Sequence, residues 1–261
     1  MSKLISNHDS NKDLLTYSDV ESKRFGMRVF RGMMDEIDSD QILSTLIEYE
    51  VDLAILRIPA SRQYQIPLLG EKGIPYIIAD TLVYYAVDLT KYIPKPIKNR
   101  DLVFKKCSYE DIDTIKALVE VIFSSYTNHY TSNPYLKRKD ILNGYKEWAC
   151  NYVLEDDLHQ TVWLASNNDM GNVGFATCNC NEGVGEGVLN GVLPTAARHG
   201  IYTDIIRFYQ DYIKNAGCSR MIIATQIQNI VVQRVWNREG FELDQAYITV
   251  HINRFLRRSQ K

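Results

Sequence analysis

The residues from Pro194 to Thr203 form a turn whose composition favours phosphate binding. Pro194 ends an apolar stretch, and Gly200 lies six residues later, directly before a segment with helical apolar spacing. A helix that begins there has free backbone N–H groups and the positive end of its dipole at Gly200, and both attract phosphate. Arg198 and His199 could add positive charge. The turn therefore predicts a site for a phosphate-bearing molecule.

Two residues of the next helical segment share one face. Asn229 and Trp236 lie seven positions apart, about two helical turns. Asn229 is also a favourable N-cap residue, which gives it a purely structural alternative. The indole of Trp236 can donate a hydrogen bond but cannot act as an acid. Trp236 could therefore form the wall of a pocket, while another group, such as Tyr202 or Tyr209, or water supplies any proton.

A loop dense in tyrosine, asparagine and histidine lies between two helical segments. It contains Tyr126, His129, Tyr130, Asn133 and Tyr135. Such side chains are better suited to hydrogen-bonding a polar ligand than to packing, so this loop is a predicted binding segment for a polar ligand. His129 is the predicted general base because the pKa of imidazole lies near neutrality. The alternative is a histidine that only hydrogen-bonds within the fold.

Three further groups have both a chemical and a structural interpretation. Glu186 is flanked by two glycines, which allow a ligand to approach closely, and it could orient water or serve as a base. The basic run at 137–139 could contact a nucleotide diphosphate or simply face solvent. Cys178 and Cys180 alternate along a strand pattern without further ligands nearby, so no metal site is predicted.

The elements that position these residues have the order of a mixed α/β sheet. Apolar residues at helical spacing predict helices over 110–126 and roughly 139–153, and after Gly200 and Asn229. Short apolar runs predict the strands of this half of the chain, at 102–107, 161–166, 173–180, 188–193, 221–224 and 247–252.

The first part of the chain predicts a smaller α/β unit. Strands are expected at 25–31, 52–58, 76–79 and 82–89, with helices at 63–72 and after a capping box formed by Asp38 and Gln41. Two prolines at 94 and 96 favour an extended linker. We therefore expect a small N-terminal α/β domain over 1–97 and a second domain over 98–261.

Composition excludes several classes of protein. A chain of 261 residues with 45% hydrophobic residues has enough apolar side chains for a sizeable core. A net charge of −2 gives no electrostatic case for nucleic acid. The apolar runs are too short to span a membrane. The polar N-terminus lacks a signal-peptide pattern, and five scattered cysteines suit reduced thiols, so a cytoplasmic location is expected.

The ordered motifs resemble those of the GCN5-related N-acetyltransferase (GNAT) superfamily over roughly residues 100–261. The residues that carry the resemblance are Val192, Pro194, Gly200, Asn229, Trp236, Gly240 and Phe241. Several positions depart from the usual pattern of the superfamily. Ala197 replaces glutamine or arginine, Tyr202 replaces a small residue, and Trp236 replaces the tyrosine that often acts as the general acid. Val232 and Val235 replace alanine and leucine.

The resemblance implies a substrate site and a reaction. A strand that separates from its neighbour would bind the pantetheine arm of acyl-coenzyme A (acyl-CoA) and polarise the thioester, and the following loop would hold the pyrophosphate. The coenzyme would contact Val192, Leu193, Arg198, His199, Gly200, Ile201, Tyr202, Thr203 and Asn229. His129, Glu186 and Trp236 would form the catalytic group, and no metal is implied.

The whole chain is similar to the TDP-fucosamine acetyltransferase type. The pattern Tyr-x-x-His-Tyr-x-x-Asn-Pro at 126–134 carries this likeness. It implies acyl transfer, of an acetyl or larger group such as hydroxybutyryl, to a dTDP-linked deoxyamino sugar for lipopolysaccharide and O-antigen synthesis. Alternatives are a GNAT enzyme for another small amine or a protein N-terminus, and a non-catalytic acyl-CoA sensor. The assembly state stays open, a homodimer included.

Overall fold

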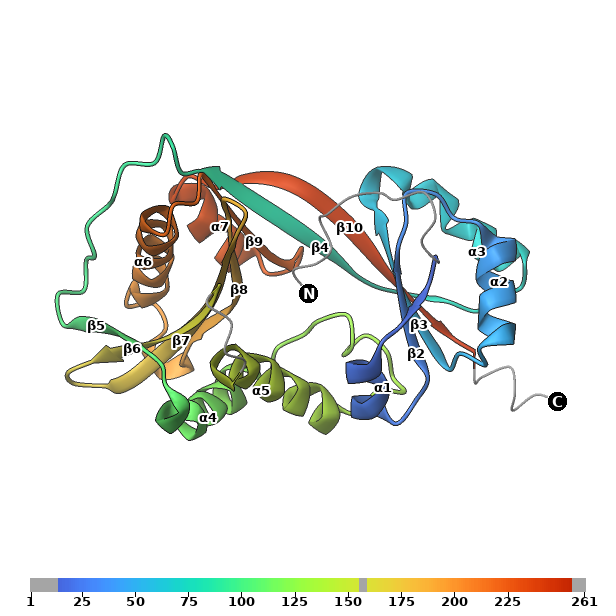
Figure 1. The fold of residues 1–261 in the computed structure, drawn as a ribbon, viewed down its shortest axis with the longest axis horizontal. Helices are drawn as coiled ribbons and strands as arrows, with labels where there is room; N and C mark the ends of the chain where they lie inside the picture. Colours follow the sequence, from blue (N-terminus) through green and yellow to red (C-terminus); the bar gives the residue numbers. More distant parts are fainter. Residues whose placement is uncertain (1–13, 155–158, 255–261) are drawn as a thin grey trace. The chain divides into compact units, whose positions relative to one another are not determined.

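The computed structural model describes residues 14–154 and 159–254, and it confirms the predicted mixed α/β class (Figure 1). The described residues pack into two compact units. Unit 1 contains 14–83, 127–141 and 245–254, and unit 2 contains Tyr84–Tyr126 and Leu142–Asp244. Three elements contribute residues to both units: β4 (Ile77–Asp88), α5 (Arg138–Leu154) and β10 (Glu242–Asn253).

These units differ from the division expected at residue 97. The chain passes between them four times, at 83/84, 126/127, 141/142 and 244/245. The segment 127–141 and the last strand therefore pack with the N-terminal residues rather than with the second half of the chain. β10 is antiparallel to β3, from Tyr247 opposite Pro59 to Asn253 opposite Leu53. Apolar patterns predict single elements, whereas this long-range pairing depends on packing.

Two elements of unit 1 were not predicted from the sequence pattern, and one strand was predicted as two separate strands. A short strand and a helix precede the first expected strand, and the strands expected at 76–79 and 82–89 form the single strand β4. The Asp38 carboxylate accepts a hydrogen bond of 2.9 Å from the Gln41 N–H, as a capping residue should. The remaining elements are β1 (Thr16–Tyr17), α1 (Asp19–Phe25), β2 (Val29–Met33), α2 (Ser39–Glu48), β3 (Leu53–Pro59) and α3 (Pro67–Glu71).

The two faces of the unit 1 sheet differ in chemistry. One face is apolar and packs with α2 and α3, through residues such as Ile42, Leu56 and Val250. The opposite face carries buried polar side chains. Side chains alternate along a strand, so the buried Arg57, Thr249, His251 and Asn253 share that face, together with the half-buried Arg31.

Unit 2 contains a mixed sheet in the order β4-β9-β8-β7-β6-β5, in which β8 and β9 are parallel. The helices α4 and α5 cover one face and α6 covers the other (Figure 1). The elements are β5 (Leu102–Lys106), α4 (Ile112–Phe123), β6 (Gln160–Asn167), β7 (Gly171–Asn181), β8 (Val184–Val192), α6 (Ile201–Asn215), β9 (Arg220–Gln226) and α7 (Ile230–Arg238).

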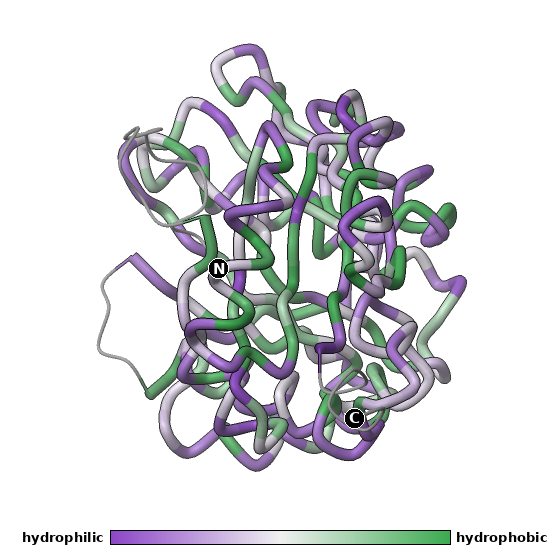
Figure 2. The backbone as a smooth tube through the Cα atoms, turned by 90° about the vertical axis from the view of Figure 1, so that its right-hand side faces the viewer, coloured by the Kyte–Doolittle hydropathy of each residue, from purple (hydrophilic) through white to green (hydrophobic). Residues whose placement is uncertain are grey.

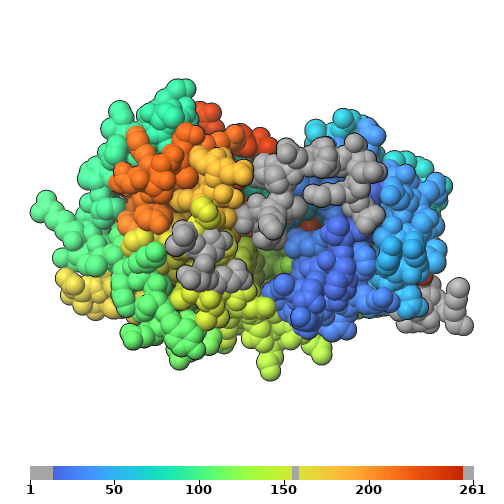
Figure 3. Space-filling view, viewed as in Figure 1, coloured from blue at the N-terminus to red at the C-terminus, as the bar shows by residue number. Residues whose placement is uncertain are grey.

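The segment 92–99, which contains the predicted extended linker, is a strap held against α6 within unit 2. It is irregular, as its prolines predict, but its backbone is bonded to the helix. Arg207 Nη1 donates to the Pro96 carbonyl at 2.8 Å, and Lys214 Nζ donates to the Tyr92 carbonyl at 2.6 Å. The green segment lies on the molecular surface next to the orange helix α6 (Figure 3). Buried polar side chains of α6 need partners, and the strap supplies them.

Hydrophobic stretches of the described chain are short and are interrupted by hydrophilic residues (Figure 2). Within 14–154 and 159–254, no helix has the length and apolar character that a membrane span requires.

Candidate active site

The parallel strands β8 and β9 separate part-way along their length. Their pairing runs from Val184 opposite Arg220 to Gly187 opposite Ile223. Among the described residues it goes no further, although β8 continues to Val192 and β9 continues to Gln226. Beyond Gly187, the edge of β8 that faces β9 therefore has backbone groups available to another extended chain.

A bulge in β8 coincides with the point of separation. In the pairing with β7, Thr177 lies opposite Leu189 and Cys178 lies opposite Gly187, so Val188 is the extra residue. The Thr177 hydroxyl accepts a hydrogen bond of 2.9 Å from the Leu189 N–H and donates one of 3.1 Å to its carbonyl. These two bonds fix the bulge on the β7 side.

The backbones of Val192 and Leu193, both predicted to contact the coenzyme, differ in their availability to a ligand. The Leu193 N–H donates to the Val173 carbonyl at 2.8 Å, and the Leu193 carbonyl accepts from the Ala196 N–H at 2.9 Å. Both backbone groups of Leu193 are therefore already bonded within the protein. Because N–H groups alternate along an extended strand, the Val192 N–H points to the opposite edge, which faces the gap.

The predicted phosphate-binding turn has a left-handed backbone at Gly200, a conformation that favours glycine. A 3-10 turn at Pro194–Ala196 leads to Arg198, with φ of 68°, and to Gly200, with φ of 79°. Gly200 is the N-cap of α6, and the first helical hydrogen bond is from the Asp204 N–H to the Gly200 carbonyl at 3.1 Å. The N–H groups of Ile201, Tyr202 and Thr203 therefore have no helical acceptor. Arg198 and His199 are exposed beside them.

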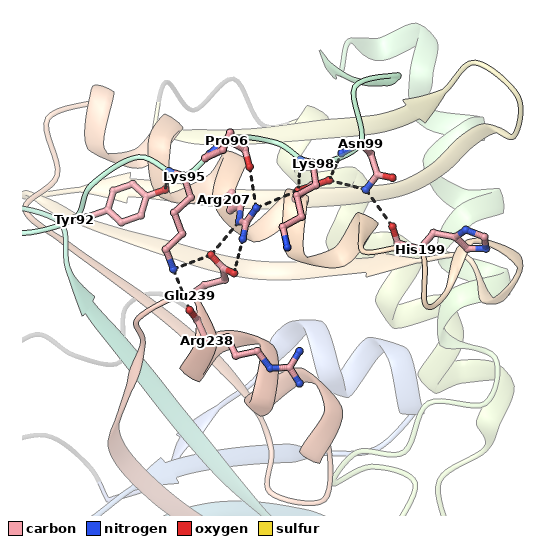
Figure 4. A network of polar contacts seen from close by, with 10 residues as sticks. Tyr92, Lys95, Pro96, Lys98, Asn99, His199, Arg207, Arg238 and Glu239 are labelled. Carbon is pink, nitrogen blue, oxygen red and sulfur yellow. Dashed lines mark hydrogen bonds and ion pairs between the residues drawn. The ribbon is translucent and has the colours of Figure 1, made fainter.

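The strap fixes this turn through a buried carboxylate, and Figure 4 shows Lys98 and Asn99 of the strap near His199 of the turn. Asp204 is fully buried and accepts hydrogen bonds from the backbone N–H groups of Lys98 and Asn99, at 3.0 and 2.9 Å. The Asn99 amide donates to Asp204 at 2.7 Å and to the His199 carbonyl at 3.1 Å. Because Asp204 bonds to the strap, it does not occupy the free N–H groups of the first turn.

A buried ion pair also secures the strap to the end of α7 (Figure 4). The Arg207 guanidinium donates two hydrogen bonds to Glu239, at 3.1 and 3.0 Å. Lys95 Nζ lies 3.2 Å from the same carboxylate. Burial alone would raise the pKa of Glu239, but Arg207 and Lys95 outweigh it and hold this pKa below its usual value. The sequence patterns of these residues did not reveal this network.

An aromatic pair joins the first turn of α6 to α7. Trp236 is 1% exposed, and its Nε1 donates a hydrogen bond of 3.1 Å to the Tyr202 hydroxyl. The Tyr85 ring packs edge-on against the indole at 5.5 Å between centroids. The position at which the resemblance implies an acidic tyrosine is thus occupied by a buried donor that is already bonded.

The residues at the end of β9 bring two predicted contacts together. The Tyr126 hydroxyl donates to Gln226 and lies 3.4 Å from the Thr225 hydroxyl. The Asn229 amide donates to the same Thr225 hydroxyl at 3.0 Å. Asn229 is the N-cap of α7, as expected, but its side chain does not cap the helix. Tyr126 and Asn229, predicted to contact different substrates, therefore meet at Thr225.

Glu186 lies on β8 immediately before the bulge. A Cβ atom at Gly185 would meet Ile213 of α6, and one at Gly187 would meet Tyr209 of the same helix. Side chains alternate along a strand, so the half-buried Glu186 points to the opposite face, which α4 and α5 cover. The structure therefore places a carboxylate next to the point where β8 and β9 separate.

The predicted base His129 is buried in unit 1 and belongs to a chain of hydrogen bonds. The Tyr135 N–H donates to Asn133 Oδ1 at 3.2 Å, which orients the amide so that Asn133 Nδ2 donates to His251 Nδ1 at 3.1 Å. His251 Nε2 must then carry a proton and donate it to His129 Nδ1 at 2.9 Å. Burial, with His251, Arg31 and Arg57 nearby, lowers the pKa of His129 well below 6.5. These contacts favour the structural interpretation of His129.

The other residues of the predicted acceptor loop also lie in unit 1, except for Tyr126. The Tyr130 hydroxyl donates to Glu21, and Asn133 Nδ2 donates to Asn253 Oδ1 at 2.9 Å. Both side chains are buried, whereas Tyr135 is 45% exposed. The polar atoms of Tyr130 and Asn133 are thus bonded to protein groups. The pairing with His251 was missed because the two histidines are 122 residues apart.

The cysteines of β7 are not activated nucleophiles. Burial raises the pKa of the Cys178 thiol and of the Cys180 thiol to about 12. Both therefore stay protonated near neutrality, whereas a nucleophilic cysteine needs its thiolate form. In the described part of the chain, no group of three or more histidine, cysteine or carboxylate side chains could hold a metal ion.

Comparisons with known proteins identify the fold. No protein-family model and no curated protein matches the sequence. A functionally unknown conserved protein from Staphylococcus epidermidis is similar in structure, with a TM-score of 0.65 and 13% identity over 96% of this chain and 95% of that chain. A GCN5-related N-acetyltransferase from Sphaerobacter thermophilus has a TM-score of 0.60 and 13% identity over 91% and 74%.

A third similar structure is a GCN5-related glucosamine N-acetyltransferase region of a fungal multi-domain GH3 beta-N-acetylglucosaminidase. It has a TM-score of 0.62 and 12% identity over 91% of this chain and 30% of that chain. At these identities the likeness concerns the fold. Together with the separated parallel strands, the bulge and the glycine-capped helix, it shows that this chain has the fold of the GCN5-related N-acetyltransferases.

Proposed function

We propose that this protein is an N-acyltransferase that moves an acyl group from acyl-CoA to the amino group of a dTDP-linked deoxyamino sugar. The observation that carries the proposal is the separation of β8 and β9 after Gly187, next to the free N-terminus of α6. An extended arm can hydrogen-bond to the open strand edge while its phosphates bind the helix N-terminus.

The coenzyme contacts follow from this arrangement. The Val192 N–H is directed at the gap and would bond to the pantetheine arm or polarise the thioester carbonyl. The N–H groups of Ile201, Tyr202 and Thr203 would hold the pyrophosphate, with Arg198 exposed beside them. Leu193 is left out of the set because its backbone groups are bonded to Val173 and Ala196.

The proposed reaction is direct transfer between two bound substrates. The neutral amine attacks the thioester carbon, a C–N bond forms, and the C–S bond breaks. We assign the general base to Glu186 because its carboxylate lies beside the separating strands, whereas His129 is buried and hydrogen-bonded within unit 1.

The raised pKa of the Cys178 and Cys180 thiols disfavours a covalent acyl-enzyme intermediate. Parallel lines in initial-velocity plots would contradict direct transfer.

Two observations support an amino sugar as the acceptor. The loop pattern from Tyr126 to Pro134 resembles that of enzymes for dTDP-linked amino sugars. In addition, one similar structure is named as a glucosamine N-acetyltransferase region. A surface-polysaccharide role in the cytoplasm belongs to the same proposal. Another small amine or a protein N-terminus, and an acyl-CoA sensor without activity, are the competing functions.

Amine-dependent thiol release distinguishes these functions. The protein is incubated with acetyl-CoA or hydroxybutyryl-CoA and a panel of dTDP-linked amino sugars, and free thiol and product masses are recorded. We expect thiol release only with an amino sugar, together with a product heavier by one acyl group. Release with simple amines or peptides alone would favour the second function. Coenzyme binding without release for any amine would favour the sensor.

A matched pair of variants at Gly200 tests whether the turn before α6 binds the phosphates of the coenzyme. Asparagine and aspartate tolerate the left-handed backbone of this residue comparably, and they differ by one negative charge. We expect Gly200→Asp to weaken CoA binding about tenfold or more relative to Gly200→Asn, because repulsion of about 1.4 kcal/mol corresponds to that ratio. Isothermal calorimetry measures both affinities. Equal affinities would place the phosphates elsewhere.

A further inference from the structure

We propose that Tyr202 supplies the hydrogen bond and the proton that the leaving sulfur of the coenzyme needs, and that the buried Trp236 positions its hydroxyl. This inference rests on the proposed acyltransferase function. It assigns the acid role to a residue of α6 because the residue at the expected position on α7 is an indole.

The hydrogen bond between the two residues determines where the phenolic proton points. An indole nitrogen can only donate, so the Tyr202 oxygen is the acceptor of the 3.1 Å bond from Trp236 Nε1. The Tyr202 proton must therefore point elsewhere. Within residues 14–154 and 159–254, the structure shows no acceptor for it. Tyr202 is half-buried as a residue, and a hydroxyl with an uncommitted proton is suited to donating it to a substrate.

A comparison with Tyr126 shows why Tyr202 is the donor. The two hydroxyls are close enough for Tyr126 to influence the titration of Tyr202. The Tyr126 hydroxyl, however, already donates to Gln226. The Tyr202 side chain extends from the first turn of α6 to Trp236 of α7, the position at which the resemblance implies a proton donor for the sulfur. Of these two hydroxyls, that of Tyr202 is therefore the one whose proton is available to the sulfur.

The surroundings keep Tyr202 protonated. Burial raises the pKa of Tyr202 above its usual range, the hydrogen bond from Trp236 opposes this change, and Tyr126 adds to it. The hydroxyl thus carries its proton at neutral pH. The bond from Trp236 stabilises negative charge on the phenolic oxygen, which makes Tyr202 a stronger hydrogen-bond donor than it would be without the indole.

The protons released and taken up in this step are equal in number, so no further reactant is needed. As the C–N bond forms and the C–S bond breaks, the sulfur leaves with the bonding electron pair and accepts the Tyr202 proton. The phenolate regains a proton that the attacking nitrogen releases, through Glu186 or water. The net transfer is one proton from nitrogen to sulfur, and Trp236 stabilises the phenolate in between.

The pKa of the CoA thiol in the complex is the first test, and it requires no acceptor. Thiolate absorbance in the ultraviolet is recorded against pH with CoA bound to the wild type and to Tyr202→Phe. A donor beside the sulfur stabilises its thiolate, so we expect this pKa to be lower in the wild type and to rise in the variant. Tyr212→Phe is the control, because Tyr212 lies on the same helix and packs against Trp163.

Turnover gives the second test. We expect Tyr202→Phe to lower kcat about tenfold or more, with the affinity for CoA retained. Trp236→Phe should have a smaller effect, and the double variant should be no slower than Tyr202→Phe, because Trp236 acts through Tyr202. The double variant also removes both hydrogen-bonding partners, so it leaves no buried N–H unsatisfied if the single variant folds poorly.

The outcomes separate the two proposals. Absence of CoA binding to the wild type would overturn the acyltransferase function itself. Normal CoA binding, with the same thiol pKa and the same turnover in the wild type and in Tyr202→Phe, would overturn only the role of Tyr202. Independent, additive losses from Tyr202→Phe and Trp236→Phe would show that Trp236 does not act through Tyr202.

Discussion

Glu186→Gln is expected to lower kcat by about 100- to 10,000-fold, the usual contribution of a general base. A sugar amine is largely protonated near neutrality, and only its neutral form attacks a thioester. The Glu186 carboxylate lies on β8 immediately before the strands separate, and it faces the side covered by α4 and α5. Glutamine keeps the size and polarity of the side chain but cannot accept the proton.

The pH dependence distinguishes loss of the base from loss of structure. The deficit of Glu186→Gln should shrink as pH rises, because more free amine then forms without help. Affinity for CoA should be retained, since the carboxylate does not lie in the phosphate turn. Glu182→Gln is the matched control, because Glu182 is an exposed carboxylate at the tip of the same hairpin. A normal kcat with an unchanged pH profile would indicate that water takes the proton.

The stability of the protein should fall steeply as pH decreases below 6.5, because His129 and His251 are buried as neutral rings. The pKa of His251 is lowered from 6.5 to about 4, with burial as the main cause, and that of His129 is lowered as well. Below pH 6.5 these histidines bind protons in the unfolded chain but not in the folded chain. The free energy of unfolding therefore falls as the pH decreases from 6.5 towards 4. This lowering of the pKa corresponds to about 3 kcal/mol in the free energy of unfolding for His251 alone.

Denaturant unfolding above and below pH 6.5 measures this effect. His129→Asn should reduce the pH dependence, because it removes one of the two groups that must stay neutral. His159→Asn is the control, because His159 is exposed and lies outside this cluster. An identical pH dependence in the wild type and in His129→Asn would be inconsistent with a neutral buried pair. If His129→Asn instead stops turnover while CoA still binds, His129 is the base.

The sequence alone determined the features that depend on neighbouring residues. A left-handed backbone at a helix N-terminus requires glycine or a close substitute, so Gly200 indicated both the start of α6 and the phosphate turn. Apolar periodicity located the strands and helices of unit 2 because an element buries one face whatever lies opposite. The mixed α/β class and the strand before the turn follow from such local rules.

Only the tertiary structure decided which of the candidate residues act together. His129 is bonded to His251, 122 residues away, and the strap residue Asn99 is bonded to Asp204, 105 residues away. Trp236 donates to Tyr202 across two helices. Each contact satisfies a buried polar group whose partner is set by how distant elements pack, and no local pattern encodes that choice. Packing therefore left His129 inside unit 1 and gave Tyr202 a free proton at the turn.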